Sequence, residues 1–226
     1  MSIANRLTTI AENEIKVYEA GIEDGKQAEY DRFWGNYKLD GMCAFAGSGW
    51  NNETFKPKND IVPSTAYMMF RYSNIQGDLV HILENLGVVL DFSKCYSLQY
   101  TFQNTKFTRI GEIVAKTNFI EGFSNNPQLE TIDKIVTTSS ITYGNASFSG
   151  CTGLKNITFE GEIGNTINFQ WCPLTKESIT SIINALSATK TGQTATFKQT
   201  AKEAAFTDDE WATLIATKSN WTISLV

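Results

Sequence analysis

The stretch SFSGCTGLKNITF, Ser147 to Phe159, has an apolar pattern that no single helix or strand explains. Its apolar residues lie at offsets 0, 3, 6, 9 and 11, and they are Phe148, Cys151, Leu154, Ile157 and Phe159. A helix would place them every 3.6 residues and a strand every second residue. The pattern therefore predicts a backbone that passes through a tight turn and then runs as a short strand.

Degenerate copies of this pattern occur elsewhere in the chain. They are FSNNPQLETI from Phe123, FQNTKFTRI from Phe102, LDFSKCYSLQY with Phe92, Cys95 and Leu98, and NFQWCPL with Phe169 and Cys172. The spacings between Phe102, Phe123, Phe148 and Phe169 are 21, 25 and 21 residues. A period in the twenties indicates a repeat architecture, in which equivalent side chains stack in the core. We therefore predict that these four phenylalanines stack, and that Cys95, Cys151 and Cys172 are reduced and buried small core residues.

The segment FSGCTGLKNITF resembles the leucine-rich repeats of the BspA-like type, whose units read roughly AF-x-x-C-x-x-L-x-x-I-x-I. The resemblance covers residues 88–172, and insertions such as KIVTTSSITYGN make the copies unequal. Together with the patterns at the two ends of the chain, described below, it implies an α+β fold: a short irregular leucine-rich-repeat-like β-solenoid with N-terminal helices and an α/β C-terminal cap. The corresponding domains would be 1–39, a helical segment; 40–87, an irregular linker or N-terminal cap; 88–172, the repeats; and 173–226, the C-terminal cap.

The N-terminal segment predicts two helices. One carries an apolar seam with a carboxylate in it, formed by Ile3, Leu7, Ile10, Glu14 and Val17, and the second presents Tyr30, Phe33, Trp34 and Tyr37 on one face. Two interpretations stay open: a short self-associating coiled coil, giving a homodimer or homotrimer, or two helices packed on their own domain. Glu14 argues against the coil because an ionised seam residue is costly to desolvate, although a polar seam residue can also set the register.

Three further segments have distinct patterns. Residues 40–85 read as turn-rich, with AYMMFRY as a candidate strand and GDLVHILENLG as a short helix that stops at Gly87. In the last 54 residues, PLTKESITSIINALSAT predicts a helix, and TGQTATFKQ and NWTISLV predict strands. TAKE at Thr200 and TDDE at Thr207 both fit a capping box, and the second would start a helix with Lys218 in its last turn.

Composition and charge limit the possible functions. The chain has 226 residues, a net charge of −5 and a pI near 5.0, with no run of three basic residues, so we expect no nucleic-acid partner. No apolar run is long enough for a membrane span, and the N-terminus lacks the apolar region of a Sec signal, so we expect synthesis in the cytoplasm. The four cysteines and single His81 form no closely spaced ligand pairs, so we expect no metal and no cofactor.

No catalytic motif is present: the sequence has no GxSxG, P-loop or HExxH, and His81 has no partner placed beside it. We therefore expect a non-catalytic recognition or adhesion module, with a purely structural component as the alternative and a glycan-active enzyme as a third hypothesis. If Ile157 and Phe159 point inward, strand alternation places Asn156 and Thr158 on the outer, ligand-binding face. In the earlier copy, either Tyr100 or Thr101 would take that place.

A second resemblance concerns both ends of the chain. KVYEAGIEDGKQAEYDRFW and the ending SITSIINALSATKTG…WATLIATKSNWTISLV look like proteins of phages and prophages of Gram-positive gut bacteria. This resemblance implies a virion- or tail-associated protein. Its expected partners are other copies of itself, other virion proteins, and a glycan or protein on the host surface.

Overall fold

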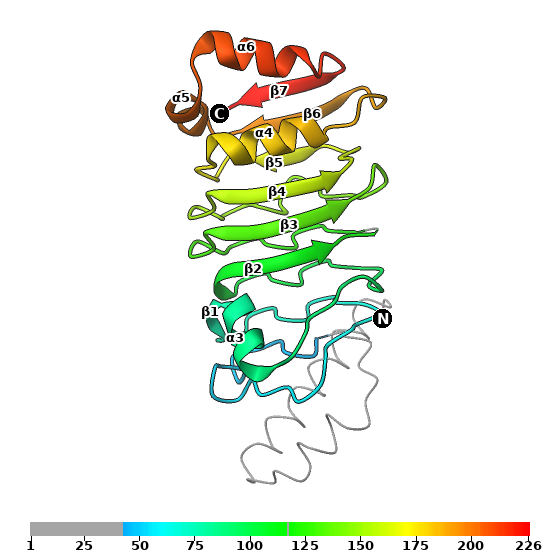
Figure 1. Ribbon diagram of the computed structural model, residues 1–226, viewed down its shortest axis with the longest axis vertical. Helices are drawn as coiled ribbons and strands as arrows, with labels where there is room; N and C mark the ends of the chain where they lie inside the picture. The colour runs from blue at the N-terminus through cyan, green and yellow to red at the C-terminus, as the bar shows by residue number, and fades with distance from the viewer. Residues whose placement is uncertain (1–42, 117) are drawn as a thin grey trace, which may run out of the picture.

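Parallel strands lie one above another along the described part of the molecule (Figure 1). The computed structural model describes residues 43–116 and 118–226. A four-stranded parallel sheet has the order β1-β2-β3-β4, and a three-stranded parallel sheet has the order β5-β6-β7. In chain order the elements are β1 (Gln76–Asp78), α3 (Leu79–Leu86), β2 (Lys106–Val114), β3 (Thr131–Thr137), β4 (Asn156–Gly161), β5 (Ile167–Phe169), α4 (Lys176–Ala185), β6 (Gln193–Phe197), α5 (Gln199–Ala205), α6 (Asp208–Ala216) and β7 (Trp221–Leu225).

The fold class predicted from the sequence is wrong. The described chain is α/β, with two small parallel sheets and four helices, and not an α+β β-solenoid with a separate cap. The first sheet begins at β1, before the predicted repeats, and the second joins β5 to β6 and β7 near the C-terminus. Three helices, α4, α5 and α6, occur among the strands where a solenoid would add further strands. A degenerate repeat specifies which side chains stack, but it leaves open where helices replace strands.

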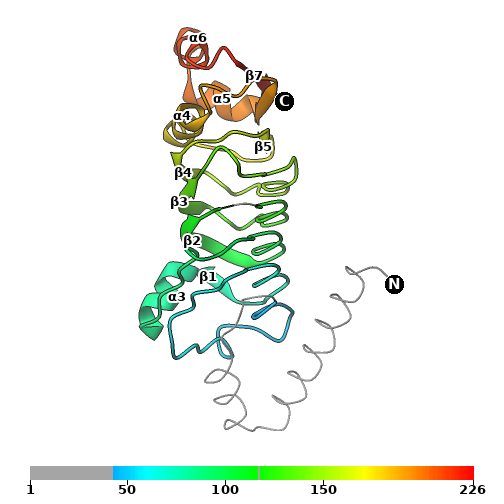
Figure 2. The ribbon, with the colours of Figure 1, turned by 90° about the vertical axis from the view of Figure 1, so that its right-hand side faces the viewer.

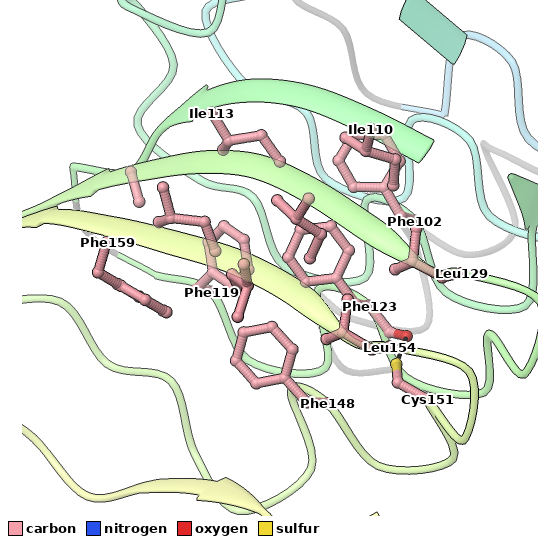
Figure 3. Packing of buried hydrophobic residues seen from close by; sticks show 14 of the residues in the cluster. Phe102, Ile110, Ile113, Phe119, Phe123, Leu129, Phe148, Cys151, Leu154 and Phe159 are labelled. Carbon is pink, nitrogen blue, oxygen red and sulfur yellow. Dashed lines mark hydrogen bonds between the residues drawn. The ribbon is translucent and has the colours of Figure 1, made fainter. Parts of the chain in front are cut away.

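The predicted phenylalanine stack is confirmed, and it is longer than expected. Phe102, Phe123, Phe148 and Phe169 are all fully buried, with successive ring centroids 5.3, 5.5 and 4.4 Å apart. Figure 3 shows the first three of them. The stack continues to Phe70, Phe45 and Phe197, and Trp211 of α6 meets Phe197 edge-on at its end. One hydrophobic cluster therefore runs through the described chain, with the sheet strands on one side and tight turns on the other.

The turns themselves stack in a regular column across the core from the first sheet (Figure 2). One position of the turn recurs at Gly47, Tyr72, Asn104, Asn125 and Gly150. The backbone N–H at this position donates to the next turn, to the carbonyl of the residue just before the equivalent position. The four bonds run from Gly47 to Arg71, from Tyr72 to Gln103, from Asn104 to Ser124 and from Asn125 to Ser149. Each residue of this series has a positive φ, including Gly150 at its end. A second series, Cys43, Met68, Tyr100 and Glu121, has the same pairing and also a positive φ. Two positions of one repeated turn therefore account for all the non-glycine residues with positive φ in the described chain.

Helix α4 explains why the first sheet stops at β4. The N–H groups of Ile157 and Phe159 on the outer edge of β4 donate to the hydroxyls of Ser178 and Ser181, each at 2.9 Å. The Ser178 hydroxyl in turn donates to the carbonyl of Lys155 at 3.0 Å. Two serines one helical turn apart thus satisfy edge groups that would otherwise pair with another strand.

The helices and strands predicted near the C-terminus are confirmed. Three predictions are corrected: one concerns a strand earlier in the chain, and two concern the ends of C-terminal helices. The candidate strand AYMMFRY is a run of turns, because its backbone bonds to the neighbouring turns. Thr200 lies inside α5, whose N-cap Lys198 makes no side-chain cap bond, whereas Thr207 and Glu210 form the predicted capping box. Lys218 lies beyond α6, and its ammonium donates instead to carbonyls at the C-terminal end of α4. The N-terminal helices and their seam, Ile3 to Val17, lie outside the described residues.

Candidate functional site

A groove of about 300 Å³ lies where the outer face of the first sheet meets the N-terminal end of α4. Its lining combines backbone and side chains of β3, β4 and the first turn of α4: Thr131, Ile132, Asp133, Asn156, Ile157, Thr158, Thr175, Glu177 and Ser178. Two of the residues predicted from the sequence, Asn156 and Thr158, therefore line one groove. Both are exposed, while Ile157 and Phe159 between and after them are buried, as the predicted alternation required.

Local structure makes the groove polar. Asn156 is paired with Thr131 across the parallel ladder, and its side-chain amide donates to the Thr131 hydroxyl at 3.3 Å. The register shifts between Ile132 and Ile135, so that two residues of β3, Asp133 and Lys134, face the single Thr158 of β4. Such a bulge re-aims side chains on an otherwise regular face. The groove thus offers hydroxyl, amide and carboxylate groups over a floor that includes Ile132 and Ile157.

The charged groups beside the groove are paired with one another. The Arg109 guanidinium contacts Asp133 through two nitrogens at 2.8 and 2.9 Å, and Asp78 at 3.4 Å. Lys134 lies between Glu112 at 2.8 Å and Glu160 at 3.0 Å. Hydrogen bonds to these carboxylates raise the pKa of both cations above their ordinary values. Each cation meets two carboxylates, so the face carries excess negative charge at neutral pH.

The two carboxylates of the groove lie in different environments. Both oxygens of Asp133 are engaged by Arg109, which leaves it poorly placed to deliver or accept a proton. Glu177 is the other carboxylate of the groove and is exposed in the first turn of α4. Hydroxyl and amide groups beside carboxylates, on a rigid sheet, suit the recognition of hydroxyl-rich or polar ligands.

The structure does not bring Tyr100 and Thr101 to this groove. Thr101 is fully buried, and its hydroxyl donates to the Ala66 carbonyl at 2.7 Å, so it has no surface for a ligand. Tyr100 lies in the column of turns across the core, where its backbone N–H donates to the Ile120 carbonyl. The prediction that one of them shares a face with Asn156 and Thr158 is wrong, because residues 98–104 form stacked turns and not a strand.

The sequence reasoning missed a surface cluster beside Tyr100, which we call the tyrosine–arginine cluster: Tyr67, Met68, Arg71, Tyr72 and Tyr100. The Arg71 guanidinium lies 4.8 Å from the centroid of the Tyr72 ring and 5.2 Å from that of Tyr100. Tyr67 and Tyr100 meet edge-on at 5.9 Å. Burial of the Tyr67 ring, and then the nearby Tyr100, raise the pKa of Tyr67. Alignment of Phe70 with Phe102 and Phe123 would have revealed the turn that presents these side chains.

The described residues also bear on metal binding and on membrane insertion. There, no group of three histidine, cysteine or acidic side chains is arranged to hold a metal ion. In the same part of the chain, no helix is both long and apolar enough to cross a membrane.

Comparisons with known proteins returned no match: no family model, no curated protein and no solved structure is significantly similar to the chain. The resemblances drawn from short motifs therefore remain predictions. Arguments about function rest on the groove and on the tyrosine–arginine cluster.

Proposed function

We propose that this chain is a non-catalytic recognition or adhesion module that binds a glycan or protein on a cell surface. The observation that supports it best is the groove in which the predicted residues Asn156 and Thr158 meet Thr131 and Glu177. Hydroxyls, an amide and a carboxylate over a partly apolar floor match the alternating polar and apolar surface of a saccharide. The rigid parallel sheet beneath would hold these groups in place without an ordering cost on binding.

The setting we propose is a phage virion or tail, as the motif resemblance implies. In that setting the partners are other copies of the chain, other virion proteins and the host surface. Self-association would use the N-terminal seam of Ile3, Leu7, Ile10, Glu14 and Val17, since symmetric homo-oligomers are common among such assemblies. Light scattering of the whole chain and of a version without residues 1–25 tests this part: the whole chain should be a dimer or trimer and the shortened one a monomer.

The test of recognition is retention on immobilised cell-wall polysaccharides and on whole bacterial cells. The double variant Asn156→Ala/Thr158→Ala removes the amide and hydroxyl from the groove. We expect it to weaken binding at least about tenfold, since a single lost hydrogen bond is worth about that much. The matched control is Thr152→Ala/Asn184→Ala, which removes the same two groups from exposed positions outside the groove. Equal binding by the two double variants would refute a role for the groove.

A purely structural role is the second candidate, and one observation favours it. The charges of the sheet face are paired internally, as in Lys134 with Glu112 and Glu160, which stiffens the face without requiring a ligand. This alternative predicts incorporation into particles together with no retention on any surface polymer. Retention that depends on Asn156 and Thr158 would decide against it.

A further inference from the structure

The tyrosine–arginine cluster holds a cation that lacks a counter-ion within the described chain. Arg71 and Arg109 are the two arginines of residues 43–116 and 118–226. Arg109 contacts two carboxylates, whereas Arg71 makes none of the salt bridges found in this part of the chain. Its two hydrogen bonds are weak: Nη1 donates to the Met68 sulfur, a weak acceptor, at 3.5 Å, and Nη2 donates to the Tyr72 hydroxyl at a long 3.4 Å.

The donor inventory of Arg71 leaves room for a ligand. A guanidinium has five N–H groups in a planar fork, and two of them are used here, one toward a weak sulfur acceptor. Its Nε is shielded from solvent and has no partner within the described residues. One N–H on each Nη remains, and this pair suits a carboxylate or phosphate, which accepts two parallel hydrogen bonds.

The backbone of Tyr72 is a second, independent indication. Its φ is +61°, a conformation that tyrosine rarely adopts, and its counterparts in the stacked turns are Gly47, Asn104, Asn125 and Gly150. Glycine and asparagine tolerate this conformation best, so Tyr72 is the exception in the series. The Tyr72 ring lies over the Arg71 guanidinium, and the residue as a whole is still 52% exposed. Burial of apolar surface therefore does not explain why a tyrosine occupies this position. A residue type that the backbone conformation disfavours, found at an exposed position, points to a functional role.

We propose that the tyrosine–arginine cluster binds an anionic group, a carboxylate or a phosphate, carried on a saccharide chain. Arg71 donates its free pair of N–H groups to the anion, and the exposed Tyr72 ring packs against the apolar face of the adjoining sugar ring. The anionic group follows from Arg71 alone, while the saccharide rests on the proposed function. The site would act locally, because a net charge of −5 gives the chain no general attraction for polyanions.

Three polymers that share one backbone provide the probe: dextran, carboxymethyl dextran and dextran phosphate. We expect the full chain to bind one or both anionic forms at least tenfold more tightly than dextran, with an affinity that falls as salt is added. Preference for one anionic form identifies the source of the charge. Equal binding to all three polymers, or no binding to any, overturns the proposal.

Two substitutions separate a binding role from a structural one. Arg71→Gln should abolish the preference for anionic dextran, whereas Lys190→Gln, the same charge change at an exposed lysine elsewhere, should leave it intact. Tyr72→Asn installs the residue found at Asn104 and Asn125, so it should keep or raise the melting temperature while weakening binding at least tenfold. A Tyr72→Asn variant that is less stable and binds unchanged would mean that the ring is merely structural, and it would overturn the proposal.

The groove variant Asn156→Ala/Thr158→Ala separates this proposal from the proposed function. Anionic dextran binding that survives in the groove variant but is lost in Arg71→Gln supports the cluster as a distinct site. Anionic binding lost only in the groove variant refutes the cluster and leaves the proposed function standing. If both variants bind cell-wall polymers and anionic dextran like the unmodified chain, both ideas fail.

Discussion

The Thr105 backbone N–H donates to the Oδ1 atom of Asn126 at 2.7 Å, across two stacked turns. Asn126 is 1% exposed, and its amide nitrogen donates to the carbonyls of Phe102 at 2.5 Å and Phe123 at 2.8 Å. Its oxygen also accepts from the Thr105 hydroxyl at 3.0 Å. One buried side chain therefore satisfies groups from two turns, at the position that Cys151 occupies in the next turn, where the thiol donates to the Phe123 carbonyl.

Asn126→Ala should be strongly destabilising. It would leave the Thr105 N–H buried without this partner and remove one donor from each of the Phe102 and Phe123 carbonyls, which keep the Thr105 hydroxyl and the Cys151 thiol as donors. A buried group left unsatisfied costs about 1–3 kcal/mol, and each further lost hydrogen bond adds to this. We expect a loss of at least about 3 kcal/mol in the free energy of unfolding, measured by urea denaturation. Asn125→Ala at the exposed neighbour is a control for the loss of an amide, although its positive φ adds a small cost of its own. A loss below about 1 kcal/mol at Asn126 would contradict the bonding described here.

Phe148→Ala should also destabilise the chain, through packing and not through hydrogen bonds. Phe148 is fully buried between Phe123 and Phe169, with ring centroids 5.5 and 4.4 Å away. Removing the ring leaves a cavity in the middle of the stack, at a cost of about 3–5 kcal/mol. Phe148→Leu fills part of that space and should cost less. Urea unfolding of the two variants provides the measurement, and equal stabilities would show that the stack contributes little.

Side-chain burial could be predicted from the sequence, and the path of the backbone could not. The repeated phenylalanine and cysteine positions identified core residues, because residues of these apolar types recur at the spacing of the stacked turns. AYMMFRY predicts a strand because it is a nearly continuous apolar run, but such a run also fits turns whose N–H groups bond to the turns beside them. The α/β class was missed because Ser178 and Ser181 replace a strand partner with a helix, and serines are common in any surface segment.

The candidate sites divide in the same way. Asn156 and Thr158 were predicted because they lie on a regular strand, where alternation fixes the exposed face. Asp133 and Glu177 were missed because they reach the groove through a bulge and a helix start, and both are tertiary features. The pairing of Arg71 with Tyr100 joins residues 29 positions apart, which only the stacking of turns brings together.

Ser178→Ala should destabilise the edge of the first sheet. Its hydroxyl accepts from the Ile157 N–H and donates to the Lys155 carbonyl, and Ser178 is 4% exposed, so both groups would lose their partner in a place that water reaches poorly. We expect a loss of about 1–3 kcal/mol in the free energy of unfolding. Ser181→Ala should cost less, because Ser181 is only partly buried. Faster hydrogen exchange at Ile157 in Ser178→Ala would localise the effect, and unchanged exchange would contradict it.

The buried thiol of Cys151 should make stability depend on alkaline pH. Burial raises the pKa of this thiol to about 12 from its ordinary value of 9.0, so the folded chain holds the proton more tightly than the unfolded chain does. The contribution is therefore complete below pH 9.0 and is lost as the pH rises toward about 12. Burial acts in the same direction on Cys172 and Tyr143, whose pKa values are also raised.

Cys151→Ala isolates the part of this effect that belongs to Cys151. The variant should be less stable than the parent at neutral pH, because it loses buried volume and the bond from the thiol to the Phe123 carbonyl. As the pH rises above 9.0, the parent loses stability through Cys151 and the variant does not, so the difference between them should shrink. Urea unfolding of both proteins under reducing conditions, at neutral pH and at successively higher pH, measures this difference. A Cys151 difference that stays constant or widens would show that its thiol is not shielded in the folded chain.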